Sequence, residues 1–93
     1  MIRNFSCKDT EKIWNGNSTR AFPHQIQDRI LRKLRQIDAA LSIEDLKNPP
    51  GNHLETLKKD RLGQLSVRVN NQWRICFRFK GGDAFDVEVV DYH

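Results

Sequence analysis

The spacing of apolar residues changes once along the chain, and this change predicts a helical first half and a strand-rich second half. Between positions 26 and 41, apolar residues recur at steps of three or four, which places them on one stripe of a helix of roughly four to five turns. The stripe consists of Ile26, Ile30, Leu34, Ile37 and Leu41. Pro23 suits the first turn of this helix, and the proline pair at 49–50 ends the helical half.

The first residues predict a short edge strand at 2–5, followed by a short helix. Ser6 and Asp9 stand in the Ser-x-x-Asp pattern that often caps a helix N-terminus. This helix should end near Trp14, because the Asn-Gly pair at 15–16 favours a turn.

After Gly51 the apolar period falls to two, which is the period of strands with one dry and one polar face. The clearest strands are 65–69, 73–79 and 85–89, and 54–57 is a candidate for one more. The breaks between them, at 70–72 and 81–83, are too short for crossover connections. We therefore expect antiparallel hairpins.

The first hairpin has a register that burial selects. A three-residue loop at 70–72 pairs Val67 with Ile75, whereas a slip of one residue would expose all the apolar side chains of one strand to water. This register places Arg68 directly opposite Arg74, on the polar face.

The second hairpin can be treated in the same way. A three-residue loop at 81–83 predicts the pairs Phe79–Phe85, Arg78–Asp86 and Arg74–Val90. Arg78 then has an acidic neighbour, whereas the Arg68–Arg74 pair has none.

The opposed arginines leave three interpretations open. Arg68 and Arg74 would repel by about 0.2–1 kcal/mol, and a bound phosphate, gripped by two parallel hydrogen bonds, would relieve the repulsion. Alternatively both side chains splay into water, or Glu55 reaches them. Tyr92 shares the face of Arg74 if the last strand runs that far. Lys58 shares it provided that residue 57 pairs with residue 65.

Composition places the chain among small basic domains. Its 93 residues suit one domain spanning 1–93, and 38% hydrophobic with 30% charged residues favours folding. Sixteen Lys and Arg against 12 Asp and Glu give a net charge of +4. Such a charge suits a polyanionic partner, although it also suits a merely soluble protein.

Several classes of protein are not expected. The first residues lack the apolar stretch of a signal peptide, and no run reaches the length of a membrane span, so we expect a cytoplasmic protein with no membrane partner. Cys7 and Cys76 do not make a disulfide framework, and Cys76 falls in an apolar strand as a buried thiol. Metal-ligand spacing is lacking around His24, His53 and His93, so no metal and no cofactor are expected.

The combination of an arginine-bearing hairpin with a C-terminal Asp-Tyr-His resembles the RelE-like toxins, and most closely their HigB branch. The matching stretches are 1–5, 37–40, 57–61, 66–69, 72–75 and 90–93. The resemblance implies an α+β, RelE-like fold. In that fold an N-terminal strand and two to three helices pack on one face of a mostly antiparallel sheet of about four to five strands.

The resemblance also implies a type II toxin that acts as a ribosome-dependent endoribonuclease on messenger RNA. In this chemistry the RNA 2′-hydroxyl attacks the adjacent phosphate, which requires a base, an acid and cations. By position, the catalytic residues would be His93, Asp91, Tyr92, Lys58 and Arg74, and the RNA-binding residues Arg68, Arg61, Lys59 and Glu55. His93 is the leading candidate for proton transfer, because an imidazole titrates near neutrality.

The chain departs from its relatives at one position. Some members have a histidine three residues before the active-site lysine, where this chain has Glu55. His53 lies two residues before Glu55 and does not align with the histidine of those members. Either Glu55 substitutes as the base or the site uses His93 alone.

The implied partners are the ribosome, messenger RNA and a cognate antitoxin. The antitoxin would be a helix-turn-helix DNA-binding protein, through which alone the toxin would meet operator DNA. Two other functions remain open: a non-catalytic RNA- or DNA-binding module, and an inactive relative that binds only an antitoxin. Arg29, Lys33 and Arg35 form a basic helix surface that either meets ribosomal RNA or is simply solvated.

Overall fold

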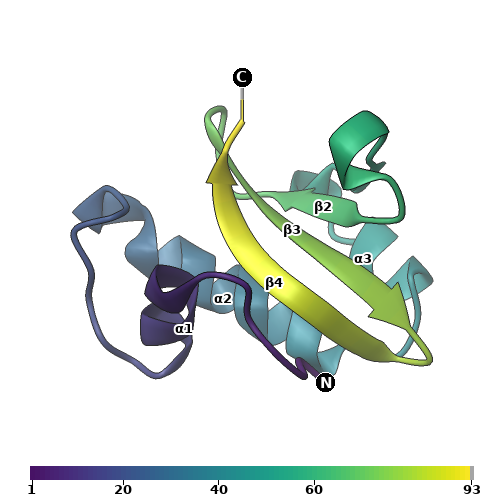
Figure 1. Cartoon of the computed structure of the whole chain (residues 1–93), viewed down its shortest axis with the longest axis horizontal. Coiled ribbons are helices and arrows are strands. Elements are labelled where there is room, and N and C mark those ends of the chain that lie inside the picture. The colour runs from purple at the N-terminus through teal and green to yellow at the C-terminus, as the bar shows by residue number, and fades with distance from the viewer. Residues whose placement is uncertain (93) are drawn as a thin grey trace.

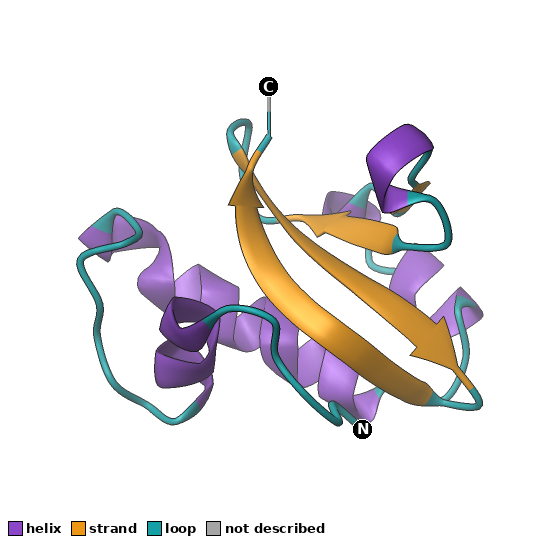
Figure 2. Ribbon diagram, in the orientation of Figure 1, coloured by secondary structure: helices purple, strands orange, loops and turns teal. Residues whose placement is uncertain are grey.

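The computed structural model describes residues 1–92, apart from the side chain of Pro50. Helices and strands divide between the two halves of the chain, as the apolar periods predict (Figures 1 and 2). The elements are α1 (Lys8–Trp14), α2 (Gln27–Ala39), α3 (Glu44–Lys47), β1 (Glu55–Thr56), β2 (Leu65–Arg68), β3 (Trp73–Lys80) and β4 (Asp83–Asp91), with 3₁₀ turns η1 (His24–Ile26), η2 (Pro50–Asn52) and η3 (Lys59–Arg61). Within residues 1–92 no helix has the length and apolar character needed to cross a bilayer.

The apolar stripe of α2 forms one side of the core, but it ends earlier than predicted. Ile30, Leu34 and Ile37 are fully buried, whereas Leu41 is 82% exposed, so its assignment to the stripe is wrong. The carboxylate of Asp45 accepts the backbone N–H groups of Leu41 and Ser42, which holds the chain out of the helix after Ala39.

The first helix ends at Trp14 as predicted, but its predicted cap is wrong by one residue. Cys7 occupies the N-cap position and makes no side-chain capping bond. Ser6 instead donates its hydroxyl to the backbone carbonyl of Asp86 (3.1 Å). The N-terminal segment is bound to β4, so Ser6 is not free to cap the helix.

The sheet is antiparallel and has the order β1-β2-β3-β4. Its apolar face packs on the helices, and the core is formed by residues such as Ile30, Leu34, Ile37, Val67, Ile75, Phe77, Val87 and Val89. The predicted register of the first hairpin is confirmed: Val67 pairs with Ile75 and Arg68 pairs with Arg74. Burial of the apolar set therefore fixes this hairpin.

The turn of the second hairpin differs from the prediction. Gly81 and Gly82 both have positive φ (60° and 82°), which allows a two-residue turn of the type that favours hairpins. The predicted pairs Phe79–Phe85 and Arg78–Asp86 are therefore wrong, because Phe79 pairs with Ala84 and Arg78 pairs with Phe85.

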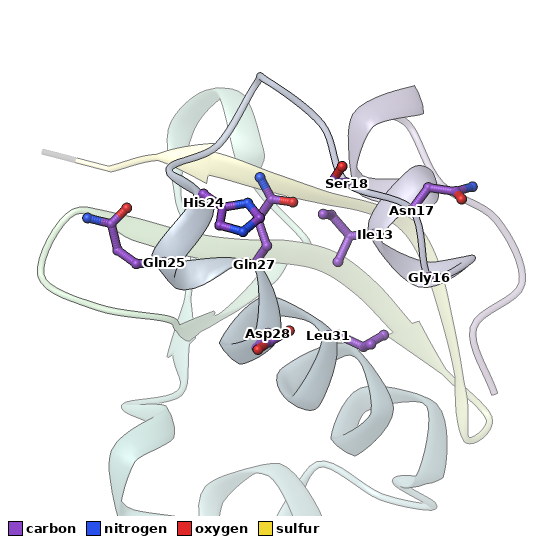
Figure 3. Close-up of a pocket in the computed structure, with 9 residues that line it drawn as sticks. All are labelled: Ile13, Gly16, Asn17, Ser18, His24, Gln25, Gln27, Asp28 and Leu31. Carbon is purple, nitrogen blue, oxygen red and sulfur yellow. The ribbon is translucent and has the colours of Figure 1, made fainter.

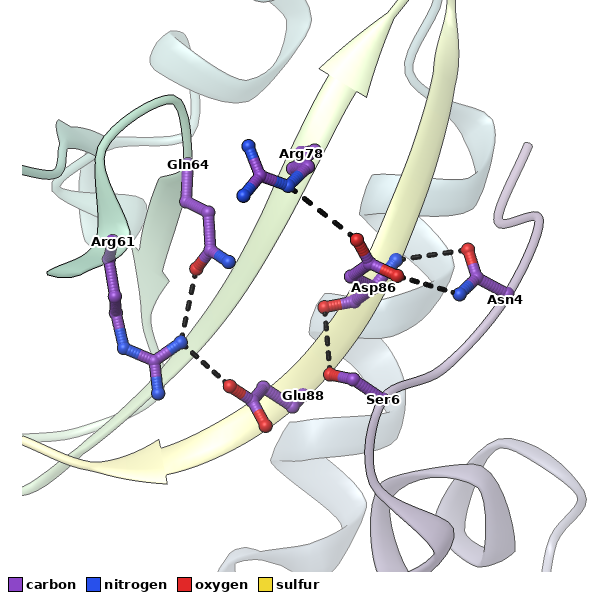
Figure 4. A network of polar contacts seen from close by, with 7 residues as sticks. All are labelled: Asn4, Ser6, Arg61, Gln64, Arg78, Asp86 and Glu88. Atoms are coloured by element: carbon purple, nitrogen blue, oxygen red, sulfur yellow. Dashed lines mark hydrogen bonds and ion pairs between the residues drawn. The ribbon is translucent and has the colours of Figure 1, made fainter.

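A bulge in β4 restores the register beyond this turn. Asp86 has φ 54°, and here β4 carries one residue more than β3, so that Arg74 pairs with Val90 as predicted. The side chain of Asn4 donates to the Asp86 carboxylate (2.8 Å) and accepts from the Asp86 N–H (3.0 Å), which stabilises the bulge (Figure 4). Arg78 still forms an ion pair with Asp86 (3.5 Å) despite the different pairing.

The predicted N-terminal edge strand is present only as two isolated parallel bridges to β4. Ile2 pairs with Ala84 and Phe5 pairs with Val87. Figure 1 shows this segment running beside β4 before it enters α1. It covers the free edge of β4, so the edge exposed by the described residues is that of β1 and β2.

Candidate active site around Arg74

Arg74 is a buried cation on the polar face of the sheet, with 6% of its surface exposed. Its Nε donates to the hydroxyl of Ser66 (2.7 Å), and its Nη2 donates to the backbone carbonyls of Ser66 (3.2 Å) and His53. A buried guanidinium requires such acceptors, because an unpaired charge in the interior is costly. The result is a guanidinium group held in one orientation.

Glu55 is the acidic neighbour of this arginine. It pairs with Ser66 across β1 and β2, which places its side chain on the face that carries Arg74. Its Oε1 lies 3.5 Å from Nη1 of Arg74, and its side chain remains 48% exposed. Of the interpretations left open for Arg74, contact with Glu55 is the one the structure contains. The carboxylate is both oriented by the arginine and accessible to a ligand.

Tyr92 lies on the same face, beyond the end of β4. The guanidinium carbon of Arg74 is 5.6 Å from the centroid of the Tyr92 ring, within the range of a cation–π interaction. Tyr92 is 37% exposed, so part of its ring is available for stacking on a base. The prediction that Tyr92 shares the face of Arg74 is confirmed.

Lys58 reaches the site by a different route from the predicted one. Leu65 pairs with Thr56 rather than with Leu57, so the strand pairing proposed for Lys58 is wrong. The strand is too short to carry Lys58, which lies in the segment between β1 and η3. This segment and the end of β4 form an open depression of about 260 Å³, lined by Leu57, Lys58, Lys59, Asp60, Arg61 and Tyr92.

Arg61 is committed to protein contacts. It donates to Glu88 of β4 (2.7 Å) and to Gln64 (3.1 Å), as Figure 4 shows. The hydrogen bond with Glu88 raises the pKa of Arg61. This ion pair fastens η3 over the polar face, whereas Lys58 and Lys59 are exposed at the depression.

Arg68 is separated from Arg74 although the two residues are paired across the strands. It donates to Asn71 and lines another depression, which it shares with side chains of α2. The structure therefore does not bring Arg68 to the lysine-lined depression. Because β1 ends before it reaches this part of β2, the side chain of Arg68 is at an open edge.

Asp91 pairs with Trp73 and accepts a hydrogen bond from Gln72 (3.1 Å). The alternation of β4 places its side chain on the face opposite to that of Arg74. His93 lies outside the described residues, so its predicted place beside the arginine is not tested.

The remaining candidate groups lie elsewhere or contribute only backbone. His24 begins η1 and lines a pocket of about 260 Å³ between α1 and α2, in which Asp28 is the other ionisable residue (Figure 3). His53 has an exposed side chain and a left-handed backbone (φ 41°), and it offers its carbonyl to Arg74. Cys76 is buried as predicted, and burial raises the pKa of its thiol.

Two residues that accept hydrogen bonds from Arg74 were not predicted to do so. Ser66 is fully buried beneath Arg74 and supplies two of its acceptors, and the carbonyl of His53 supplies another. The position of Ser66, opposite a cysteine and two residues before Arg68, was a usable signal for a polar acceptor on this face. The contact with His53 could not be predicted from residue types, because it is made by a backbone carbonyl.

Comparison with known proteins gives a consistent set of relatives. Residues 3–93 match a family described as the RelE-like toxin of the type II toxin–antitoxin system HigB. The chain is 39% identical to the endoribonuclease HigB of Proteus vulgaris over the full length of both proteins. It is 40% identical to the toxin HigB-1 of Vibrio cholerae over 92% of each chain. A chain of the YoeB–YefM toxin–antitoxin complex of Staphylococcus aureus has a similar fold, with a TM-score of 0.62 and 21% identity over 100% of this chain and 95% of that one.

Proposed function

The chain belongs to the HigB-like family of RelE-like toxins of type II toxin–antitoxin systems, and from this membership we propose that it is an endoribonuclease that cuts messenger RNA on the ribosome. The observation that supports a reaction centre in this chain is the buried Arg74. Its fixed guanidinium lies beside an accessible carboxylate, a tyrosine ring and a lysine-lined depression.

The proposed reaction is attack of an RNA 2′-hydroxyl on its own 3′-phosphate, with release of a 5′-hydroxyl. A base must take the proton of the 2′-hydroxyl, an acid must protonate the leaving oxygen, and cations must stabilise the charge that develops on the phosphate. No metal-bound water is needed, because the nucleophile belongs to the substrate. All of these tasks fall within the chemistry of side chains.

Glu55 is our candidate for the base. It stands where some relatives carry a histidine, and Arg74 holds its carboxylate at 3.5 Å on the open face of the sheet. The arginine thereby orients the carboxylate and also contributes positive charge near the reacting phosphate. Because Arg74 is almost fully partnered by the protein, we assign it the orienting role first.

The exposed cations and the C-terminal residues have complementary roles. Lys58 neutralises charge on the scissile phosphate, Lys59 holds the neighbouring backbone, and Tyr92 stacks on a base. Arg61 keeps η3 in place through Glu88. His93 donates the proton to the leaving oxygen, and Asp91 holds the end of β4 through Gln72.

Primer extension on a messenger RNA translated in vitro tests this function. We expect new 3′ boundaries when the protein and ribosomes are both present, and none when either is omitted. His93→Ala should abolish the cuts and leave ribosome binding unchanged, since proton transfer by one side chain contributes about 100- to 10,000-fold. Ribosome binding without any cutting by the unmutated protein would instead indicate a non-catalytic module.

The family implies an antitoxin as the protein partner of this chain. We propose that this antitoxin carries the helix-turn-helix DNA-binding domain and that the toxin meets operator DNA only through it. Growth of cells after induction of the toxin alone, and with its antitoxin, separates an active toxin from an inactive relative.

A further inference from the structure

A second cationic surface lies around the end of β2 and one side of α2. Four of its members, Arg29, Arg32, Lys33 and Gln36, follow the i, i+3, i+4, i+7 spacing that places residues on one side of a helix. Together with Gly51, Arg68 and Val69, they line a depression of about 370 Å³. We call its charged members, Arg29, Arg32, Lys33 and Arg68, the α2 cluster.

Two members of the cluster are held in place by hydrogen bonds to other parts of the fold. Lys33 donates its Nζ to the side-chain oxygen of Asn52 (2.5 Å), and Asn52 is 1% exposed and donates in turn to the carbonyl of Leu46 (3.1 Å). Arg29 reaches from α2 to the carbonyl of Val69 (3.4 Å). Asn52 accepts from Lys33 without carrying a charge, so the hydrogen bond fixes the ammonium and leaves its positive charge uncompensated.

Positive charge in the cluster is concentrated and unpaired. Among residues 1–92, none of the six ion pairs of the structure includes a member of the cluster. Burial and the nearby guanidinium groups of Arg29, Arg32 and Arg68 lower the pKa of Lys33. Like charges held together in this way favour a bound anion, and arginine matches phosphate through two parallel hydrogen bonds.

The α2 cluster and the site around Arg74 are neighbours at the same end of the sheet, although the side chains of Arg68 and Arg74 line different surfaces. Arg68 of the cluster pairs directly with Arg74, and opposed Cα atoms in such strands are about 4.5–5.5 Å apart. We propose that the α2 cluster binds the sugar–phosphate backbone of RNA, next to the nucleotide that is cut, so that the two surfaces hold one continuous RNA path. This inference rests on the proposed function, because it assigns the substrate contacts beyond the reacting linkage.

The proximity of the two sites favours RNA over an acidic polypeptide as the occupant. RNA has a phosphate at every nucleotide, so one strand can place negative charge on both the α2 cluster and the site around Arg74. An acidic segment of a protein could occupy the α2 cluster alone, but it would make no use of the neighbouring reaction site.

Fluorescence anisotropy with a labelled single-stranded RNA tests the proposal. The RNA carries 2′-O-methyl groups throughout and cannot be cut by 2′-hydroxyl attack, so the result does not depend on whether the protein cleaves RNA. We expect Arg32→Glu and Arg68→Glu each to weaken binding by about tenfold at low salt and to reduce the slope of log K against log salt by about 0.7 or more. Circular dichroism confirms that each variant is folded.

Arg20→Glu is the matched control. Arg20 is exposed, lines neither this depression nor the lysine-lined one, and its reversal changes the net charge equally. It should change the affinity less than twofold. The comparison is then repeated with ribosomes that carry no messenger RNA. If the cluster variants lose affinity for these ribosomes, the bound backbone is that of ribosomal RNA. If they lose affinity only for the free strand, it is that of messenger RNA.

Equal losses for Arg32→Glu and Arg20→Glu would overturn the inference, because net charge alone would then explain them. Unchanged RNA and ribosome affinity in the cluster variants would also overturn it. If the cluster variants lose affinity only for a labelled polyglutamate peptide, the cluster binds an acidic protein segment instead.

Discussion

Replacement of Lys58 by alanine is expected to lower the rate of RNA cleavage by about 100- to 1,000-fold, the usual cost of removing one group that stabilises transition-state charge. Lys58 is exposed at the rim of the depression that Tyr92 completes. Its removal should therefore change the free energy of unfolding by less than about 0.5 kcal/mol. Single-turnover cleavage of a message on ribosomes measures the first effect, and urea denaturation measures the second.

Lys80→Ala serves as the control for Lys58. Lys80 is an exposed lysine at the far end of β3, and its removal changes the net charge by the same amount. The Lys80→Ala variant should cleave RNA at a rate within about twofold of the unmutated protein, since surface charges away from a site contribute little to it. Equal losses in the two variants would remove Lys58 from the reaction and leave only a general effect of charge.

Replacement of Arg74 by alanine is expected to affect both stability and cleavage. The buried guanidinium donates to the Ser66 hydroxyl and to two carbonyls, and its replacement removes all three hydrogen bonds at once. We expect the free energy of unfolding to fall by about 3 kcal/mol, measured by urea denaturation. Arg78→Ala, in which an exposed arginine of the same strand loses one ion pair, should cost less than about 1 kcal/mol.

Glu55→Gln separates the two roles of Arg74. The carboxylate of Glu55 is half exposed, so its neutralisation should cost less than about 1 kcal/mol of stability. If Glu55 takes the proton of the 2′-hydroxyl, the same change should slow cleavage by about 100-fold. Glu55→His, which places the residue of some relatives at this position, should restore most of the rate. A glutamine variant that cleaves at full rate would exclude Glu55 as the base.

The first hairpin shows how much of the site follows from the residue pattern. A slip of one residue would put Val67 and Ile75 on different faces, and the register that buries both with a three-residue loop places Arg68 opposite Arg74. The pattern also places Tyr92 on the face of Arg74, since alternation along β4 carries that far. Strand pairing is predictable here because a shift of one residue would expose a whole apolar face.

The parts that the sequence did not predict depend on contacts between distant segments. The bulge at Asp86 is stabilised by Asn4, more than eighty residues away by count along the chain, and no local pattern reveals it. Arg68 lines a depression with side chains of α2, at an edge of β2 that β1 does not cover, and strand length is not encoded in the alternation. Leu41 keeps the apolar spacing of α2 but is exposed, because Asp45 accepts its N–H and ends the helix.

The site around Arg74 is proposed to cut an RNA linkage by means of the 2′-hydroxyl of the RNA itself. The most direct measurement is cleavage of a message in which only the nucleotide on the 5′ side of the cut is a deoxynucleotide. The account predicts that this message resists the protein, whereas the all-ribose message is cut to fragments with 5′-hydroxyl ends. Cleavage of the substituted message at an undiminished rate would contradict the account.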